Sequence, residues 1–288
     1  MTDNPSFKIR PIVPDDLDQA MGLSKAEGWN QTEDDWKLFM GNPLNTCLVA
    51  EFNHKVAGTA TAFCYSDKVA WIGMVLVDKN LRGKGAGKML LTNIIESLKH
   101  IDSIKLDATP EGQPLYHKLG FTEEHKIFRM TNTSLNNCLN KKPLIEPGHI
   151  DRECLPEVIK LDSRIFGTDR TYLLQTLLQN YPKKAFLLNR DLKPDGFIFG
   201  RDGERFNYIG PVSAYSSDSA KMLIEMALLS LKNKPVALDI MEDKEDLIRW
   251  LESTGFVKQR HFTRMFLKSN SYKGILKNQY LICGPEFG

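Results

Sequence analysis

An internal repeat is the feature that most limits how this chain can fold. Residues 104–130 and 236–265 each begin with an apolar run ending in Leu-Asp and continue through a helical stretch and a Gly-Phe pair to a closing Arg-Met. Phe121 and Met130 both have counterparts 135 residues later. Self-similarity at a constant offset indicates repeated copies of one structural unit. The sequence therefore predicts two copies of one α/β unit.

A change in composition between the copies predicts where they meet. The stretch NTSLNNCLNKKPLIEPGH, residues 132–149, is polar and rich in Asn, Lys and Pro, which is typical of a linker. We expect a first domain at residues 1–133, a linker at 134–148 and a second domain at 149–288. A chain of 288 residues, 42% of them apolar, is long enough to bury two cores.

The first copy alternates strands and helices, and its fold class follows from that order. We expect strands at residues 7–12, 69–77, 103–108 and 123–130, helices at 14–26, 85–100 and 114–119, and a hairpin at 46–65 with Asn53 and His54 at its tip. Some of these strands follow one another directly and others are separated by helices. The pattern predicts an α/β (α+β) fold, a mixed sheet with helices on its faces.

Composition and charge argue against several classes of partner. The 38 basic and 36 acidic side chains leave a net charge of +2, which gives no general argument for binding nucleic acid or a membrane surface. No apolar run approaches the roughly 18–20 residues that a membrane span needs. The N-terminus lacks the basic and apolar regions of a secretory signal. We therefore expect a cytoplasmic protein with neither a nucleic-acid nor a membrane partner.

Cysteine usage agrees with that compartment. The five cysteines are Cys47, Cys64, Cys138, Cys154 and Cys283. Their odd number, their wide spacing and the lack of a CxxC pair argue against a disulfide framework or a zinc site and favour reduced thiols. No His is positioned by local sequence to activate any of them. We expect neither a metal nor a cysteine nucleophile.

The stretch LRGKGAGKML, residues 81–90, joins an apolar strand to an amphipathic helix through three glycines. A Walker A loop, GxxxxGK[ST], does not fit, because Met89 stands where Ser or Thr is required. A dinucleotide-binding GxGxxG does not fit either, because its third glycine falls on Lys88 or Leu90. A third pattern, [R/Q]-x-x-G-x-[G/A], fits when it starts at Arg82.

A strand that enters a helix through such a turn makes a site for phosphate oxygens. The first N–H groups of a helix have no partner within it and lie at the positive end of its dipole. Glycines remove the side chains that would keep an anion away from those amides. Arg82, Lys84 and Lys88 add positive charge. The alternative is a glycine-rich turn whose lysines are simply solvated.

Downstream of the turn comes LYHKLGF, residues 115–121, a short helical stretch that contains a tyrosine and ends in Leu-Gly-Phe. Together with Arg82, Gly85 and Gly87, this segment resembles the GNAT superfamily of N-acetyltransferases. The resemblance covers most of residues 7–130 and implies two tandem GNAT-like domains, each a mixed, mostly antiparallel sheet flanked by helices. The second copy matches only in outline, because its turn is four residues shorter and has no glycine. A degenerate second domain without the pyrophosphate loop is therefore expected.

The resemblance implies that acetyl-CoA binds to the first domain. Backbone amides of the strand before the turn would contact the pantetheine arm and the thioester carbonyl, where a hydrogen-bond donor stabilises the oxyanion. The turn would hold the pyrophosphate. The expected cofactor-binding residues are Met74, Val75, Leu76, Val77, Arg82, Gly83, Lys84, Gly85, Ala86, Gly87, Lys88, Thr109 and Tyr116.

Tyr116 and Asp107 are the expected catalytic residues. Tyr116 matches the family's tyrosine that protonates the departing thiolate, and a phenol with an ordinary pKa near 10 carries that proton at neutral pH; the alternative role is packing on a short helix. The family often supplies a base from the strand before the turn, but AWIGMVLV contains no acid. Asp107, Glu123, Glu124, an acid from the second copy and a chain of waters all stay open as the base.

The stretch EGWNQTEDDW, residues 27–36, lies where the family commonly binds its acceptor. Trp29, Asn30 and Asp35 are expected to form a cup for a small polar molecule. The same residues also read as a helix N-terminus capped by Thr32, and the two interpretations are compatible. The second domain is expected to cover this pocket, with LICGPEFG at residues 281–288 closing it; pairing of the domains without substrate contact is the alternative.

The predicted function is therefore an acetyl-CoA-dependent N-acetyltransferase. An amine of a small-molecule acceptor would attack the thioester directly in a ternary complex. The alternative is a non-catalytic acyl-CoA-binding or regulatory module, which the missing acid in AWIGMVLV favours. The sequence leaves open the acceptor, the acyl chain length and the choice between a monomer and a homodimer.

Overall fold

A computed structural model describes residues 6–134 and 146–288. Cys138 and most of the predicted linker lie outside these residues. The first half contains β1 (Lys8–Pro11), α1 (Leu17–Ala26), α2 (Glu33–Met40), β2 (Thr46–Phe52), β3 (Lys55–Tyr65), β4 (Val69–Val77), α3 (Ala86–Ser97), β5 (Ser103–Ala108), α4 (Gln113–Lys118) and β6 (Thr122–Asn132).

The second half repeats this order and ends in one additional short strand. It contains β7 (Gly148–His149), α5 (Leu155–Phe166), α6 (Thr171–Asn180), β8 (Phe186–Arg190), β9 (Lys193–Arg201), β10 (Asn207–Ala214), α7 (Ser217–Ser230), β11 (Val236–Met241), α8 (Glu245–Ser253), β12 (Val257–Lys268) and β13 (Gln279–Leu281). Single 3-10 turns lie at Pro14–Asp16, Lys79–Leu81, Pro182–Lys184 and Leu276–Asn278.

These elements confirm the predicted fold class and nearly all the predicted element positions. Asn53 and His54 form the hairpin tip with φ values of 49° and 60°. The third helix begins at Ala86 rather than at Gly85, because Gly85 has a left-handed φ of 95° that a helix interior does not accept. The second helix begins after Thr32, whose side chain accepts a hydrogen bond from the amide of Asp35, as the predicted cap requires.

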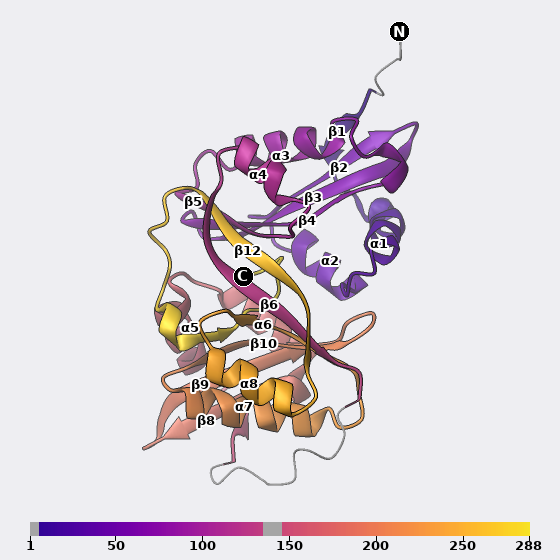
Figure 1. Cartoon of the computed structure of the whole chain (residues 1–288). Coiled ribbons are helices and arrows are strands. Elements are labelled where there is room, and N and C mark those ends of the chain that lie inside the picture. The colour runs from indigo at the N-terminus through magenta and orange to yellow at the C-terminus, as the bar shows by residue number, and fades with distance from the viewer. Residues whose placement is uncertain (1–5, 135–145) are drawn as a thin grey trace.

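All thirteen strands of the described chain form one continuous sheet, in the order β1-β2-β3-β4-β5-β12-β6-β11-β13-β10-β9-β8-β7. Only β4–β5 and β10–β11 pair in parallel, so the sheet is mixed and mostly antiparallel. The two halves exchange their last long strands: β12 lies beside β5 of the first half, and β6 lies beside β11 of the second half. Figure 1 shows β6 and β12 crossing side by side between the halves.

The pairing of β6 with β12 is symmetric. Thr122 lies opposite Phe266 and Thr131 lies opposite Val257. Phe266 and Val257 stand 135 residues after Thr131 and Thr122, which is the offset of the sequence repeat. Each strand therefore presents the same edge to the other, as two subunits do across a twofold axis.

Two buried ion pairs accompany the exchange. Arg129 on β6 donates two hydrogen bonds to Asp239 on β11, at 2.8 and 2.6 Å. Arg264 on β12 donates two to Asp107 on β5, at 2.8 and 2.9 Å. The Leu-Asp and Arg-Met landmarks of the repeat thus meet crosswise, each arginine binding the aspartate of the other half.

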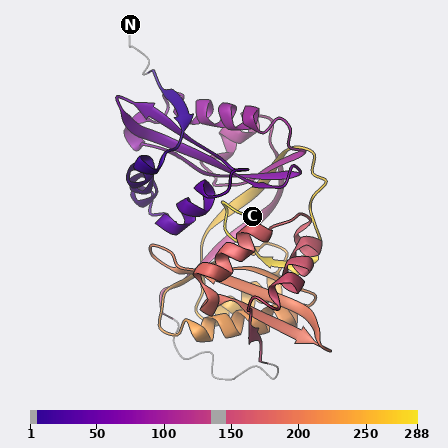
Figure 2. The ribbon, with the colours of Figure 1, turned by 180° about the vertical axis from the view of Figure 1, so that it is seen from behind.

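The layers of the molecule place a shared core between its halves. Helices α3 and α4 cover one face of the first half's sheet, whereas α1 and α2 lie on the other face, toward the second half (Figure 1). There, Trp36, Phe39 and Trp71 belong to the same hydrophobic cluster as Leu161 of α5 and Leu174 of α6. In the view from behind, the last residues of the sequence also lie between the halves (Figure 2).

Candidate active site

Strand β4 separates from β5 midway along its length. Its parallel pairing with β5 ends at Ile72, five residues before the strand itself ends. Past that point β4 contains one extra residue relative to β3, and Met74 adopts a left-handed φ of 51°. Hydroxyls of Thr61 and Thr59 donate to the carbonyls of Gly73 and Met74 at 3.1 and 2.8 Å. A bulge with a strained, buried residue beside an open strand edge is a frequent feature of functional sites.

The glycine turn follows directly and is open on its outer side. Gly83 and Gly85 have φ values of 76° and 95°, and a Cβ atom built on either would meet nothing within 4 Å. Helix α3 has no side-chain N-cap and no acidic residue in its first turn. The first amides of α3 are therefore not capped by a side chain, at a point where the backbone is unobstructed. Such a helix start can bind an anion through its free backbone amides.

The basic residues of the turn differ in their contacts and exposure. Arg82 donates to Glu27 at 2.5 Å and to the Val77 carbonyl at 3.2 Å, which fixes it against the end of α1. Lys84 and Lys88 are exposed beside the turn. All three supply positive charge near the start of α3. Of the other predicted cofactor residues, Met74, Leu76 and Ala86 have buried side chains, so only their backbone is available to a ligand.

The equivalent region of the second half is closed. Its helix α7 is capped by Ser216, which accepts a hydrogen bond from the Ser219 amide at 3.1 Å, and Asp218 adds a negative charge to the first turn. The gap between β10 and β11 is filled by β13, where Leu281 pairs with Val212 on one side and Ile240 on the other. Among the strands of residues 6–134 and 146–288, none lies between β4 and β5.

Tyr116 lies on α4 and is 9% exposed. Its ring packs edge-on against Phe121 with 5.9 Å between centroids, as the packing interpretation requires. Burial raises the pKa of its phenol to about 12. Burial is the sole cause of this rise, and no hydrogen bond to the hydroxyl is present among residues 6–134 and 146–288. Thr109 stands at the entry to α4, where its carbonyl accepts a hydrogen bond from the Gln113 amide at 3.1 Å.

Asp107 is fully buried and both its oxygens accept from Arg264, whose guanidinium lies 4.4 Å from the centroid of the Trp71 ring. Burial raises the pKa of the Asp107 carboxyl, and the Arg264 charge opposes that rise. A carboxylate with both oxygens engaged is a poor proton acceptor, so the geometry weighs against Asp107 as a base. Its catalytic role stays a prediction.

The other two predicted base candidates differ in exposure. Glu123 is half exposed and lies 2.9 Å from the His117 ring nitrogen. Glu124 is buried 3.6 Å from Lys105, and neither of its oxygens has a hydrogen-bond partner in the described chain. Burial lowers the pKa of Lys105 to about 8. Glu124 thus lies in the sheet interior rather than at the β4 bulge.

The three predicted acceptor residues lie where α1–α2 meets the second half, and two of them bind it. Asn30 donates to the Phe206 carbonyl at 3.0 Å and accepts from the amides of Arg205 and Phe206. Asp35 forms an ion pair with Arg201 at 2.9 Å. Trp29 is partly exposed and packs against the shared core. Their substrate-binding role stays a prediction.

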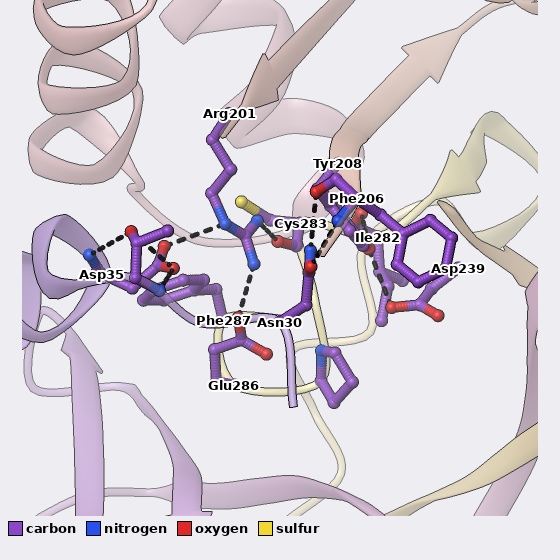
Figure 3. A network of polar contacts seen from close by, with 12 residues as sticks. Asn30, Asp35, Arg201, Phe206, Tyr208, Asp239, Ile282, Cys283, Glu286 and Phe287 are labelled. Atoms are coloured by element: carbon purple, nitrogen blue, oxygen red, sulfur yellow. Dashed lines mark hydrogen bonds and ion pairs between the residues drawn. The ribbon is translucent and has the colours of Figure 1, made fainter. Parts of the chain in front are cut away.

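Sequence reasoning missed two charged residues of this region. Arg201, at the end of β9, lies between Asp35 and Glu286, and its Nη2 donates to the Glu286 Oε1 at 2.5 Å (Figure 3). All three side chains are buried. Residues 281–288 were expected to close a pocket, but the charged partner of Glu286 stands 85 residues earlier, with no local signal to connect them.

Two family models, both described as an acetyltransferase (GNAT) domain, match residues 43–123 and 158–281. The chain belongs to the GNAT superfamily and contains two such domains in tandem. This family membership identifies it broadly as an acyltransferase.

Two proteins of similar sequence agree with this family. A holothin acyltransferase of Pseudoalteromonas sp. is 25% identical over 244 residues, which are 84% of this chain and 81% of that protein. The uncharacterized N-acetyltransferase YitH of Bacillus subtilis is 29% identical over 187 residues, 65% of this chain and 66% of that protein.

Solved structures share the fold over nearly the whole chain. A Pyrococcus horikoshii protein proposed to be an acetyltransferase has a TM-score of 0.82 at 22% identity, with 98% of this chain and 96% of that chain covered. A tandem GNAT protein from the clavulanic acid biosynthesis pathway has a TM-score of 0.64 at 12% identity, with 91% and 98% covered. At these identities the likeness concerns the fold alone.

Within 6–134 and 146–288, no three His, Cys, Asp or Glu side chains are grouped closely enough to coordinate a metal ion. In the same ranges no helix has the length and apolar character to cross a membrane.

Proposed function

We propose that this protein is an N-acetyltransferase that binds one acetyl-CoA per chain, in the gap between β4 and β5. The contrast between the halves carries the proposal. The first half has an open strand edge, an uncapped helix start and two unobstructed glycines. In the second half a strand fills the gap and a serine caps the helix.

The residues around that gap divide the chemistry between them. Amides at the start of α3, with Lys84 and Lys88, bind the pyrophosphate. The free edge of β4 past Ile72 binds the pantetheine amides and donates to the thioester carbonyl, where negative charge develops as the amine attacks. The carbon–sulfur bond then breaks, and Tyr116 gives its proton to the leaving thiolate.

The proposed acceptor is a primary amine of a small molecule. The second half covers the face of the β4 bulge through residues 282–288, and a covered site favours a small acceptor over a protein side chain. One relative is named for acylating holothin. For this chain the proposal keeps to the broader class, a primary amine.

The competing function is an acyl-CoA-binding module without turnover. The observation in its favour is that β4 contains no acid. CoA release from acetyl-CoA, measured with methylamine, ethanolamine, putrescine, glucosamine and lysine, separates the two. A catalyst releases CoA faster with at least one amine than without any, whereas a binding module does not.

Calorimetric titration of acetyl-CoA tests the site itself. A Cβ atom on Gly87 would meet Val77 and Leu115 at 3.6 and 3.8 Å, which are ordinary contacts, so the position accepts a side chain. Gly87→Glu places a carboxylate beside the predicted pyrophosphate, and Gly87→Gln has the same size without the charge. We expect a single site in the wild type and a dissociation constant at least about 10-fold higher for Gly87→Glu than for Gly87→Gln.

Three outcomes would contradict the proposal. If the wild-type protein does not bind acetyl-CoA, the proposed enzymatic function is wrong. Equal affinities for the two Gly87 variants place the pyrophosphate elsewhere. A stoichiometry of two sites shows that the second half also binds the donor.

A further inference from the structure

We infer that Glu286 takes the proton from the acceptor's ammonium group, and that the second half thereby supplies the base that β4 lacks. This inference rests on the proposed function and deepens it. An alkylammonium ion has no lone pair with which to attack a thioester, so a proton acceptor near the reacting carbonyl is required.

The segment that carries Glu286 lies against β4 at the bulge. A Cβ atom on Gly73 would come within 2.8 Å of both the Cα and the Cβ of Glu286, so only glycine at residue 73 allows this approach. The Trp71 indole donates to the Pro285 carbonyl at 3.1 Å and the Tyr65 hydroxyl donates to the Phe287 carbonyl at 2.6 Å. Glu286 is thus held on both sides, next to the residues expected to donate to the thioester.

The hydrogen bonds around Glu286 leave its carboxylate able to accept a further hydrogen bond. Asp35 uses one oxygen for Arg201 and the other for the amide and hydroxyl of Thr32. Glu286 accepts from Arg201 through Oε1 and from its own backbone amide, and no other residue of the described chain donates to its carboxylate. Figure 3 shows Arg201 between the two carboxylates. Glu286, unlike Asp35, has an oxygen available for a substrate N–H.

The charge of the cluster suits a cation. Asp35 and Glu286 carry two negative charges against the one positive charge of Arg201, so an ammonium ion would neutralise the remainder. Burial raises the pKa of Glu286; Arg201 opposes this rise, and Asp35 adds to it. Arg129, on β6, also faces Glu286 and lowers its pKa. A carboxyl with a raised pKa is a stronger base than an exposed one.

The other acids are placed less well for this step. Both oxygens of Asp107 are bound by Arg264. Glu123 is half exposed beside His117 on β6, and Glu124 is enclosed beside Lys105. Within residues 6–134 and 146–288 no hydrogen bond or ion pair joins these carboxylates to the segment of β4 past Ile72, whereas Glu286 lies against Gly73.

The proposed step conserves atoms and charge. Glu286 takes one proton from the ammonium, and the neutral amine attacks the carbonyl carbon to form the new C–N bond. The C–S bond breaks and Tyr116 protonates the sulfur. The amide nitrogen then loses its extra proton to the Tyr116 phenolate, and Glu286 releases its proton to solvent.

The test compares two nucleophiles on the Glu286→Gln variant. The first is the best primary alkylamine from the panel, which is charged at neutral pH. The second is hydroxylamine, which is largely uncharged there and needs no base to attack. We expect CoA release with the alkylamine to fall about 100-fold and release with hydroxylamine to stay within about 2-fold, after subtraction of the rate without protein.

Matched controls separate catalysis from folding. Glu157→Gln removes an exposed glutamate of α5 and should change neither rate, and thermal unfolding checks that each variant is folded. If Glu286→Gln does not fold, Glu286→Asp retains the charge for Arg201 but withdraws the carboxylate by one methylene. We then expect the alkylamine rate to fall at least about 10-fold with the hydroxylamine rate unchanged.

The inference and the proposed function fail in distinguishable ways. An equal fall with both nucleophiles, or no fall with either, overturns the assignment of Glu286 while wild-type transfer continues. Absence of transfer by the wild type with every amine overturns the proposed function, and the inference with it.

Discussion

Single residues of the candidate site differ in whether their polar atoms already form hydrogen bonds within the protein. Both oxygens of Asp107 accept hydrogen bonds from Arg264. The Tyr116 hydroxyl forms no hydrogen bond within the described chain, so removing it breaks no hydrogen bond of the fold. That difference allows a clean test of catalysis at Tyr116.

Tyr116→Phe should lower kcat by about 100-fold, because the departing thiolate loses its proton donor. The dissociation constant of acetyl-CoA should not change, since the ring still packs on Phe121. Steady-state kinetics and calorimetry measure the two quantities. Tyr215→Phe, at an exposed position on the second half, is the matched control. Full activity in Tyr116→Phe would remove the assigned role.

The candidate site was predictable at residue scale only where function depends on local sequence. The glycine turn and the tyrosine of LYHKLGF lie in short motifs whose spacing is constrained by one helix start. Arg201 and Glu286 belong to no such motif. Their contact depends on how the second half folds over the first, and two charged residues 85 positions apart leave no periodic signal.

At the scale of elements, strand identity was predictable and strand partners were not. Residues 123–130 were correctly predicted as a strand and β6 includes all of them. Alternation of side chains specifies which face a residue occupies but not which strand lies alongside. The sequence repeat therefore does not reveal the exchange of β6 and β12. The crosswise Arg–Asp pairs do explain why the repeat contains a charged residue in each Leu-Asp and Arg-Met pair.

Strand β13 was missed for a related reason. It has three residues, Gln279–Leu281, and pairs with β10 and β11 at only a few positions. So short a strand has no measurable alternation. Its effect is large nonetheless, because it occupies the gap that is equivalent to the proposed acetyl-CoA site of the first half.

The Arg264–Asp107 pair gives a prediction at this scale. Arg264→Met leaves a buried carboxylate without a partner and should lower the free energy of unfolding by about 3 kcal/mol or more. Replacing both partners, as Arg264→Met with Asp107→Leu, should recover most of the loss. Urea unfolding measures both. Arg249→Met removes an exposed arginine and should have no measurable effect. A loss in the double variant equal to that of the single would show that packing, not the unpaired charge, causes it.

For the whole molecule, the exchange predicts cooperative unfolding. Neither half can keep its sheet intact once the other has lost β6 or β12, so the two should unfold together. Of the four tryptophans only Trp250 lies in the second half. In Trp250→Phe, fluorescence therefore comes only from the three tryptophans of the first half, at the core that it shares with the second half, while far-UV circular dichroism reports the whole chain.

The two signals should share one urea midpoint in Trp250→Phe. Wild-type circular dichroism provides the control, since its midpoint shows whether the substitution itself changes stability. A fluorescence transition at clearly lower or higher urea than the circular dichroism transition would mean that the halves unfold independently.

The exchanged strands also govern how the two copies can diverge after a gene duplication. A substitution in β6 or β12 affects hydrogen bonding in the sheets of both halves. At these strands, natural selection therefore acts on the stability of both copies at once. The turn before α7 belongs to one copy alone and can lose its glycines without harm to the other. The first half needs β12 of the second copy to complete its sheet. The second copy is therefore retained for its structural role, even when it binds no ligand of its own.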